Sequence, residues 1–197
     1  MRRIGIIFAI ISGFFALQVT AAIKPISIEP NKIIKYYKKG VFVGGVSGTG
    51  YTLYNVKRKA KKKKNRRYER ISLVYADKAG ERIHEKVGYF HMSLEQKPAR
   101  LVIDLSQVGS TKINEKQVAQ IFKKSKLVKR TVMTIDPEDN STNLTLYFKR
   151  HVKARVSTLV KGKSGGKVFI DLAEIKSKKS KKKSLNKKND RKKKKSA

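Results

Sequence analysis

The chain has no cysteine, and acidic residues are scarce. Without cysteine it forms no disulfide, binds no metal through thiolates and cannot be a lipid-modified lipoprotein. Only 14 Asp and Glu residues stand against 49 Lys and Arg residues, which gives a formal net charge of +35. Such an imbalance is typical of proteins that bind polyanions.

The N-terminal residues have the pattern of a secretory signal peptide. Met1–Arg3 is a short positive start, residues 4–19 are almost entirely apolar, and Thr20–Ala22 supplies the small residues that a signal peptidase needs. An uncleaved membrane anchor is the alternative, because a spanning helix needs about 20 apolar residues. We expect cleavage after residue 22 and export to the periplasm of a bacterium.

More than half of the positive charge lies in two short runs. Residues 57–70 contain ten basic residues and one acidic residue, and residues 176–197 contain thirteen and one. Runs of like charge repel themselves and have little apolar surface to bury, so both are predicted to be disordered interaction arms. The glycine-rich stretch at 44–50 lacks the Lys-Ser/Thr of a phosphate loop. Whether residues 23–56 form strands is left open by their periodicity.

Four parts follow from this distribution. They are a signal peptide at 1–22, a glycine-containing and lysine-rich linker at 23–67 that is largely irregular, a folded domain at 68–175, and a disordered lysine-rich tail at 176–197.

Alternating apolar and polar residues dominate the predicted domain and indicate β-strands. Asn114, with Gln117 three residues later, predicts the N-terminal cap of one short helix whose buried face includes Val118 and Phe122. The strands are expected at 71–75, 82–87, 89–94, 101–105, 128–136, 144–148, 152–158 and 168–172.

One phrase occurs twice, as RLVIDL at 100–105 and KVFIDL at 167–172. Each copy ends one half of the domain. Two such halves predict an all-β fold, a small pseudo-symmetric β-sandwich with one short helix, flanked by disordered basic segments.

The phrase KPARLVIDL at 97–105, with YFHMSL before it and residues 128–172 after it, resembles the AMIN domain family. AMIN domains are β-sandwich modules of periplasmic N-acetylmuramoyl-L-alanine amidases and of type IV pilus secretins. The resemblance covers residues 68–175 and departs from the family at 82–87, which is more polar than the usual apolar run. It implies a non-catalytic role in binding peptidoglycan or in placing a protein at a cell-wall site.

Catalytic and metal sites are not expected. Asp104 and Asp171 end equivalent strands, so we interpret them as structural acceptors for a backbone N–H or an arginine and not as a general acid and base. His84, His91 and His151 lack the close spacing of a metal site. We therefore expect no enzyme activity and no cofactor.

The expected partner is peptidoglycan or another anionic envelope polymer, with a secretin or a cell-wall enzyme as a possible protein partner. Accessory docking in a type IV pilus machine and non-specific nucleic-acid binding are the alternatives; export argues against the second. The tail contains lysine without aromatics, which favours salt-sensitive, non-specific binding. The predicted polyanion-binding residues are Lys178, Lys179, Lys181, Lys182, Lys183, Lys192, Lys193, Lys194 and Lys195 in the tail, with Arg150, Lys153 and Arg155 on the second half of the domain.

Overall fold

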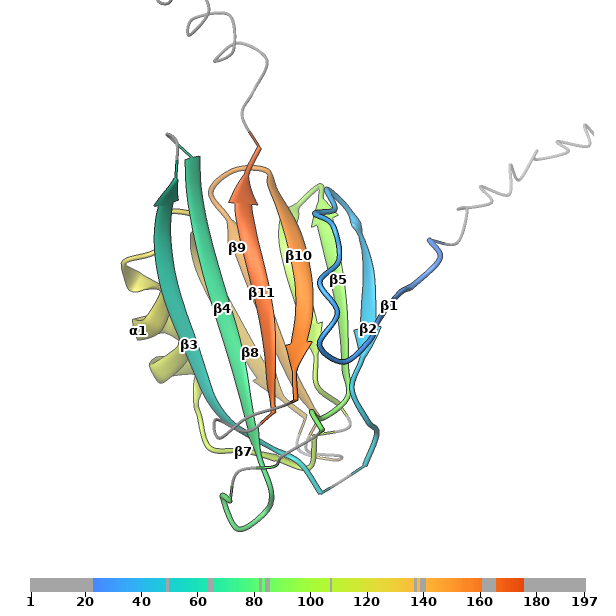
Figure 1. Cartoon of the computed structure of the whole chain (residues 1–197). Helices are drawn as coiled ribbons and strands as arrows, with labels where there is room; N and C mark the ends of the chain where they lie inside the picture. The colour runs from blue at the N-terminus through green and yellow to red at the C-terminus, as the bar shows by residue number, and fades with distance from the viewer. Residues whose placement is uncertain are drawn as a thin grey trace, which may run out of the picture.

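The protein is a sandwich of two β-sheets with one short helix at its side (Figure 1). The computed structural model describes residues 23–48, 50–63, 66–81, 83, 86–106, 108–136, 138, 141–160 and 166–175. The expected signal peptide and C-terminal tail lie outside these residues. The prediction of an all-β sandwich with one short helix is confirmed.

Six strands form one sheet and five form the other. The six-stranded sheet has the order β1 (Ile26–Ile28), β2 (Gly40–Gly44), β5 (Phe90–Gln96), β6 (Ala99–Asp104), β9 (Thr142–Phe148), β8 (Val128–Ile135). The five-stranded sheet has the order β10 (Val152–Leu159), β11 (Lys167–Glu174), β4 (Arg66–Ala76), β3 (Thr52–Lys63), β7 (Ser110–Thr111). Most neighbouring strands are antiparallel.

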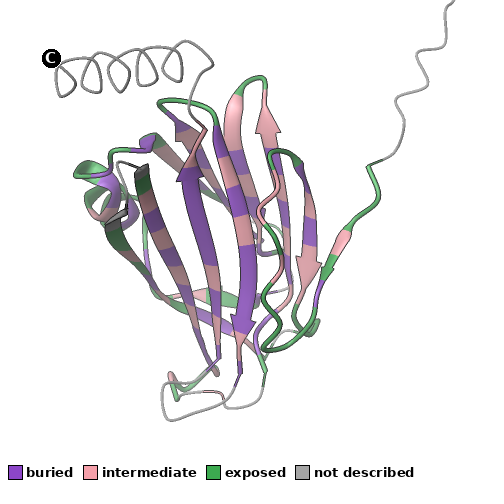
Figure 2. Cartoon of the chain, turned by 45° about the horizontal axis from the view of Figure 1, so that its top comes forward, coloured by how far each residue is buried: buried purple, intermediate pink, exposed green. Residues whose placement is uncertain are grey.

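The core lies between the sheets because one face of each strand is apolar. Figure 2 shows the buried residues as bands along the strands. Phe42, Phe90 and Ile103 from the six-stranded sheet, and Ile71 and Ile170 from the other, are 0% exposed. Burying each side chain of this kind contributes about 1.5–3 kcal/mol.

The two halves of the domain are related by a pseudo-twofold arrangement of hairpins. The first half gives hairpin β3–β4 to the five-stranded sheet and β5–β6 to the other; the second gives β8–β9 to the six-stranded sheet and β10–β11 to the five-stranded one. The orders β5-β6-β9-β8 and β10-β11-β4-β3 therefore match strand for strand. Corresponding bulges interrupt β3 between Leu53 and Asn55 and β8 between Val128 and Arg130.

Two predictions are wrong in and after the lysine-rich segment. Residues 23–67, expected to be a largely irregular linker, include β1, β2, β3 and the start of β4. The hairpin partner of β4 is β3, upstream in the chain, and residues 83, 86 and 87 of the expected strand at 82–87 lie outside any strand. The high charge of residues 57–67 concealed the alternation in which Val56 is buried and Lys57 is exposed.

Lysines suit β3 because, in the part of the chain that the structure describes, most of its outer edge has no neighbouring strand. Strand β7 pairs only with Thr52 and Leu53. Charged side chains along such an edge oppose pairing with other chains.

The helix α1 (Glu115–Lys123) begins as the sequence predicts. Asn114 accepts from the backbone N–H of Gln117 at 3.0 Å, and the Gln117 side chain accepts from the N–H of Asn114 at 2.9 Å, which completes a capping box. Val118 and Phe122 are buried. The helix packs against β8 and β3 and so lies beside the open side of the sandwich between these strands.

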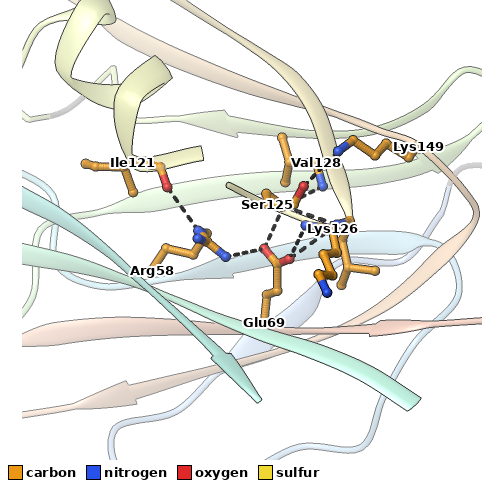
Figure 3. A network of polar contacts seen from close by, with 8 residues as sticks. Arg58, Glu69, Ile121, Ser125, Lys126, Val128 and Lys149 are labelled. Atoms are coloured by element: carbon orange, nitrogen blue, oxygen red, sulfur yellow. Dashed lines mark hydrogen bonds and ion pairs between the residues drawn. The ribbon is translucent and has the colours of Figure 1, made fainter. Parts of the chain in front are cut away.

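A buried carboxylate joins the turn after α1 to β4 (Figure 3). Glu69, 2% exposed, accepts from Ser125 Oγ at 2.7 Å and from the backbone N–H groups of Lys126 and Leu127 at 2.8 and 3.2 Å. Arg58 Nη1 lies 3.4 Å from the same carboxylate. Glu69 therefore links the two sheets at the helix side of the sandwich.

Glu69→Ala should lower the free energy of unfolding by about 3 kcal/mol, because it leaves buried donors and a guanidinium without their acceptor. Urea unfolding monitored by circular dichroism measures this loss. Glu138→Ala, which removes an exposed carboxylate, is the control and should change stability by less than about 0.5 kcal/mol. Equal losses in the two variants would contradict the structural role of Glu69.

Candidate functional site

The outer face of the five-stranded sheet gathers cations from four neighbouring strands. Strand pairing places Arg155, Asp171, Arg70 and Lys59 in one row across β10, β11, β4 and β3. We call this surface the basic face and define it by the residues Lys57, Lys59, Arg70, Lys153, Arg155, Lys167, Phe169 and Asp171, with Tyr36 against it.

Asp171 holds two arginines at the centre of the basic face. Its Oδ1 accepts from Arg70 Nε at 2.6 Å and its Oδ2 accepts from Arg70 Nη2 at 2.9 Å. Arg155 donates to Oδ2 through Nε at 3.2 Å and Nη2 at 2.6 Å. Since one carboxylate neutralises only one of the two guanidiniums, this cluster keeps a positive charge.

The pKa of Asp171 reflects both its burial and its two arginine partners. Burial alone would raise this pKa, but the hydrogen bonds and charges of Arg70 and Arg155 outweigh it and hold the pKa below its usual value. Hydrogen bonding to Asp171 also raises the pKa of Arg70, which therefore stays charged. The cluster is ionised at neutral pH.

Aromatic rings fix the direction of these cations. The Tyr36 ring lies 4.9 Å from both Arg155 Cζ and Lys153 Nζ, and the Phe169 ring lies 4.9 Å from Arg70 Cζ. Cation–π contacts of this kind contribute about 0.5–1 kcal/mol at exposed positions. Burial raises the pKa of the Tyr36 hydroxyl, with a further increase from Asp171, so that Tyr36 stays neutral.

The outer face of the six-stranded sheet has no such excess of charge. The pseudo-twofold relation places Asp104 at the position of Asp171, with His91 and Asn143 in place of Arg155 and Arg70. Asp104 accepts instead from the backbone N–H of Ser106 at 2.8 Å.

Apart from Lys129 in the bulge of β8, acidic and basic residues balance on the strands of that second face. Arg100 pairs with Glu95 at 2.8 Å. Arg130 and Asp104 are the other charged residues that strand pairing places there. The two outer faces of the sandwich therefore differ strongly in electrostatic potential.

The structure places the predicted binding residues in different surroundings. Lys153 and Arg155 lie together on the basic face, as expected. Arg150 precedes β10 and is not part of that face, because the turn after β9 directs its side chain to Glu174, with Nη1 2.7 Å from Oε1. The nine predicted tail lysines lie outside the described residues.

Sequence reasoning missed six residues of the basic face, among them Lys57, Lys59, Arg70 and Tyr36. Lys57 and Lys59 were assigned to an irregular arm, and Arg70 and Tyr36 carried no recognisable motif. The signal for the lysines was present, since Lys57 and Lys59 alternate with Val56 and Arg58. The role of Arg70 depends on its pairing with Asp171, 101 residues away, and no local pattern shows this.

The described part of the chain contains neither a candidate metal site nor a membrane-spanning helix. Among the described residues, no group of three or more His, Asp or Glu side chains is placed to bind a metal. No helix in that part of the chain is long and apolar enough to span a membrane.

Comparison with known proteins gives no family. Neither a scan of protein-family models nor a search of curated proteins finds a match. The interpretation of the basic face therefore depends on its own chemistry.

Asp171→Asn should destabilise the protein most at neutral pH. The pKa of Asp171 is lower in the folded protein than in the unfolded chain. The ionised carboxylate therefore stabilises the fold fully at pH values above the unfolded-state pKa of about 3.9, and this stabilisation is lost as the pH falls through the folded-state pKa. Urea unfolding should thus show a gap between the wild type and Asp171→Asn that narrows at about pH 3.

Asp104→Asn is the matched control, since its position corresponds to Asp171 but has no arginine bonded to it. It should lower stability less at neutral pH. A loss in Asp171→Asn that is the same at both pH values would contradict the ion-pair account.

Proposed function

We propose that this is a non-enzymatic protein of the bacterial cell envelope that binds peptidoglycan, an anionic polymer, through the basic face. The observation that carries the proposal is the difference between the two outer faces of one sandwich. A general need for solubility would not require the charge to be one-sided, whereas attraction to a polymer surface does.

Two features of the sequence support the envelope as the location. Residues 1–22 have the pattern of a signal peptide, and residues 68–175 resemble the AMIN domain. Peptidoglycan presents carboxylates on the outside of the membrane. A β-sheet face with cations on adjacent strands matches a polymer that lies flat on it.

The geometry of the basic face favours binding without strong sequence selectivity. Arg70 and Arg155 are already bonded to Asp171, and their guanidiniums pack against rings, so little side-chain entropy is lost on binding. Lys57 and Lys59 are exposed and act as point charges. We therefore expect affinity that falls steeply with salt.

The start of β4 and the end of β11 lie at one end of this face, as Figure 1 shows. Ala173, near the end of β11, pairs there with Tyr68, near the start of β4. The tail sequence that follows, with a net charge of +12, adds a second weak contact to the same polymer. Two contacts in one chain strengthen binding through effective concentration.

Protein beginning at residue 23 should sediment with isolated peptidoglycan sacculi at low salt. The double variant Lys57→Gln, Lys59→Gln should bind about thirtyfold more weakly, because each lysine near an anionic surface contributes about 1 kcal/mol. Deletion of residues 176–197 should remove much of the salt-sensitive part of binding.

The matched control is Lys97→Gln, Lys116→Gln, which removes two exposed lysines that do not belong to the basic face. It should bind nearly as well as the wild type. Equal weakening by both double variants would show that total charge, and not the basic face, determines binding, and would refute the proposal.

A further inference from the structure

A groove between α1 and β8 contains a second group of cations, separate from the basic face. It has a volume of about 400 Å³ and is lined by Ala119, Gln120, Phe122, Lys123, Val128, Lys129, Arg130, Thr131 and Lys149. Four of these residues are basic and none is acidic. No lining residue belongs to the basic face.

The four cations reach the groove from three different elements. Lys123 lies in the last turn of α1, Lys129 and Arg130 lie at the bulge of β8, and Lys149 follows β9. Cations that line one groove repel one another, and a bound anion would relieve that repulsion. The groove is therefore electrostatically suited to a small, highly charged anion.

The fold holds two of these side chains in place. The bulge in β8 sets Arg130 opposite Tyr147, and the guanidinium carbon lies 3.8 Å from the centre of the tyrosine ring. Lys149 Nζ donates to the carbonyl of Ser125 at 2.7 Å. The Ser125 hydroxyl in turn donates to the buried carboxylate of Glu69, so Lys149 is connected to the polar network of Glu69.

A hydroxyl group adds a further polar atom to the lining. Thr131 Oγ1 is buried and has no hydrogen-bond partner among the described residues. Buried polar atoms without partners are uncommon, because each costs about 1–3 kcal/mol. A small shift of the Thr131 side chain would let this hydroxyl donate to an anion in the groove.

The corresponding bulge in the other half of the domain has different chemistry. There Tyr54 and Asn55 occupy the positions of Lys129 and Arg130, and the hollow beside α1 is lined by one cation, Lys112, with neutral residues. The backbone bulge thus needs no positive charge. The cations of the α1–β8 groove are an added property of this one site.

We propose that the α1–β8 groove binds a phosphate group. A phosphate oxyanion is compact, has up to two negative charges and presents oxygens in several directions, which matches cations that approach from helix, strand and turn. Arg130 suits it best, because a guanidinium forms paired hydrogen bonds with phosphate oxygens. The group belongs either to a lipid headgroup or to a soluble phosphate compound.

The test is a titration of the isotope-labelled chain from residue 23 with inorganic phosphate at physiological ionic strength, followed by amide NMR shifts. Residues 119–131 and Lys149 should shift and saturate. Lys129→Gln, Arg130→Gln should raise the apparent Kd at least tenfold, and Lys123→Gln should raise it less. Lys78→Gln, Lys97→Gln, which removes two exposed lysines outside both the groove and the basic face, is the control with the same loss of charge and should leave the Kd unchanged.

Shifts that fail to saturate, or that are spread over lysines throughout the chain and equal in both double variants, would overturn the proposal. Because the peptidoglycan assay depends on Lys57→Gln, Lys59→Gln and the phosphate titration on Lys129→Gln, Arg130→Gln, failure of one proposal is distinguishable from failure of the other.

Vesicles decide the source of the phosphate. Binding to phosphatidylglycerol vesicles that inorganic phosphate competes away, and that Lys129→Gln, Arg130→Gln abolishes, identifies a lipid headgroup. Vesicle binding that this variant leaves unchanged, beside a saturable phosphate titration that it abolishes, identifies a soluble phosphate compound. Both results support the phosphate site.

Discussion

Two buried carboxylates allow this strongly basic chain to fold, and both act on β4. Glu69 points into the sandwich, where it binds the turn after α1 and lies beside Arg58; on the opposite face of the same strand, the next residue, Arg70, binds Asp171. Buried cations without partners would cost several kcal/mol each. Strand β4 is therefore the place where a carboxylate offsets cationic charge on each face, and the lysine-rich β3 can pair with it. Removing either acid leaves cations facing a low-dielectric interior or one another.

The remaining cations are directed to solvent, but unevenly. Lys57 and Lys59 are exposed on the edge strand β3, where their charges oppose strand addition and also strengthen the basic face. The opposite face, built from corresponding strands, balances its charges through pairs such as Arg100 with Glu95. A fold that only had to tolerate a net charge of +35 would lower its self-repulsion by spreading cations over both faces. The concentration of cations on one side lowers stability slightly, and the proposed anionic partner would account for it.

Local patterns in the sequence were sufficient for the second half of the domain and only in part for the first. Alternation predicted β8 to β11, and the cap at Asn114 predicted α1, because these signals depend on neighbouring residues. Strand β3 was missed because lysine is rare in strands and its charge suggested disorder, although the long β3–β4 ladder and an edge position allow it. For the site, Lys153 and Arg155 followed from the alternation of β10. Arg70 did not, since its role arises only when β11 pairs with β4.

A comparison of corresponding positions in the two pseudo-symmetric halves shows which side chains the fold does not require. At the centre of each outer face an aspartate ends the repeated phrase, yet only Asp171 has arginines on both neighbouring strands; Asp104 has His91 and Asn143 there. At each bulge beside α1 the backbone makes the same irregularity, once with neutral side chains and once with cations. In each case the corresponding position in the other half of the domain has fewer cations and is part of the same sandwich. The fold therefore does not require the extra cations. The extra cations of both sites therefore agree with the two proposed binding roles, and each site is tested by variants that leave its counterpart in the other half of the domain intact.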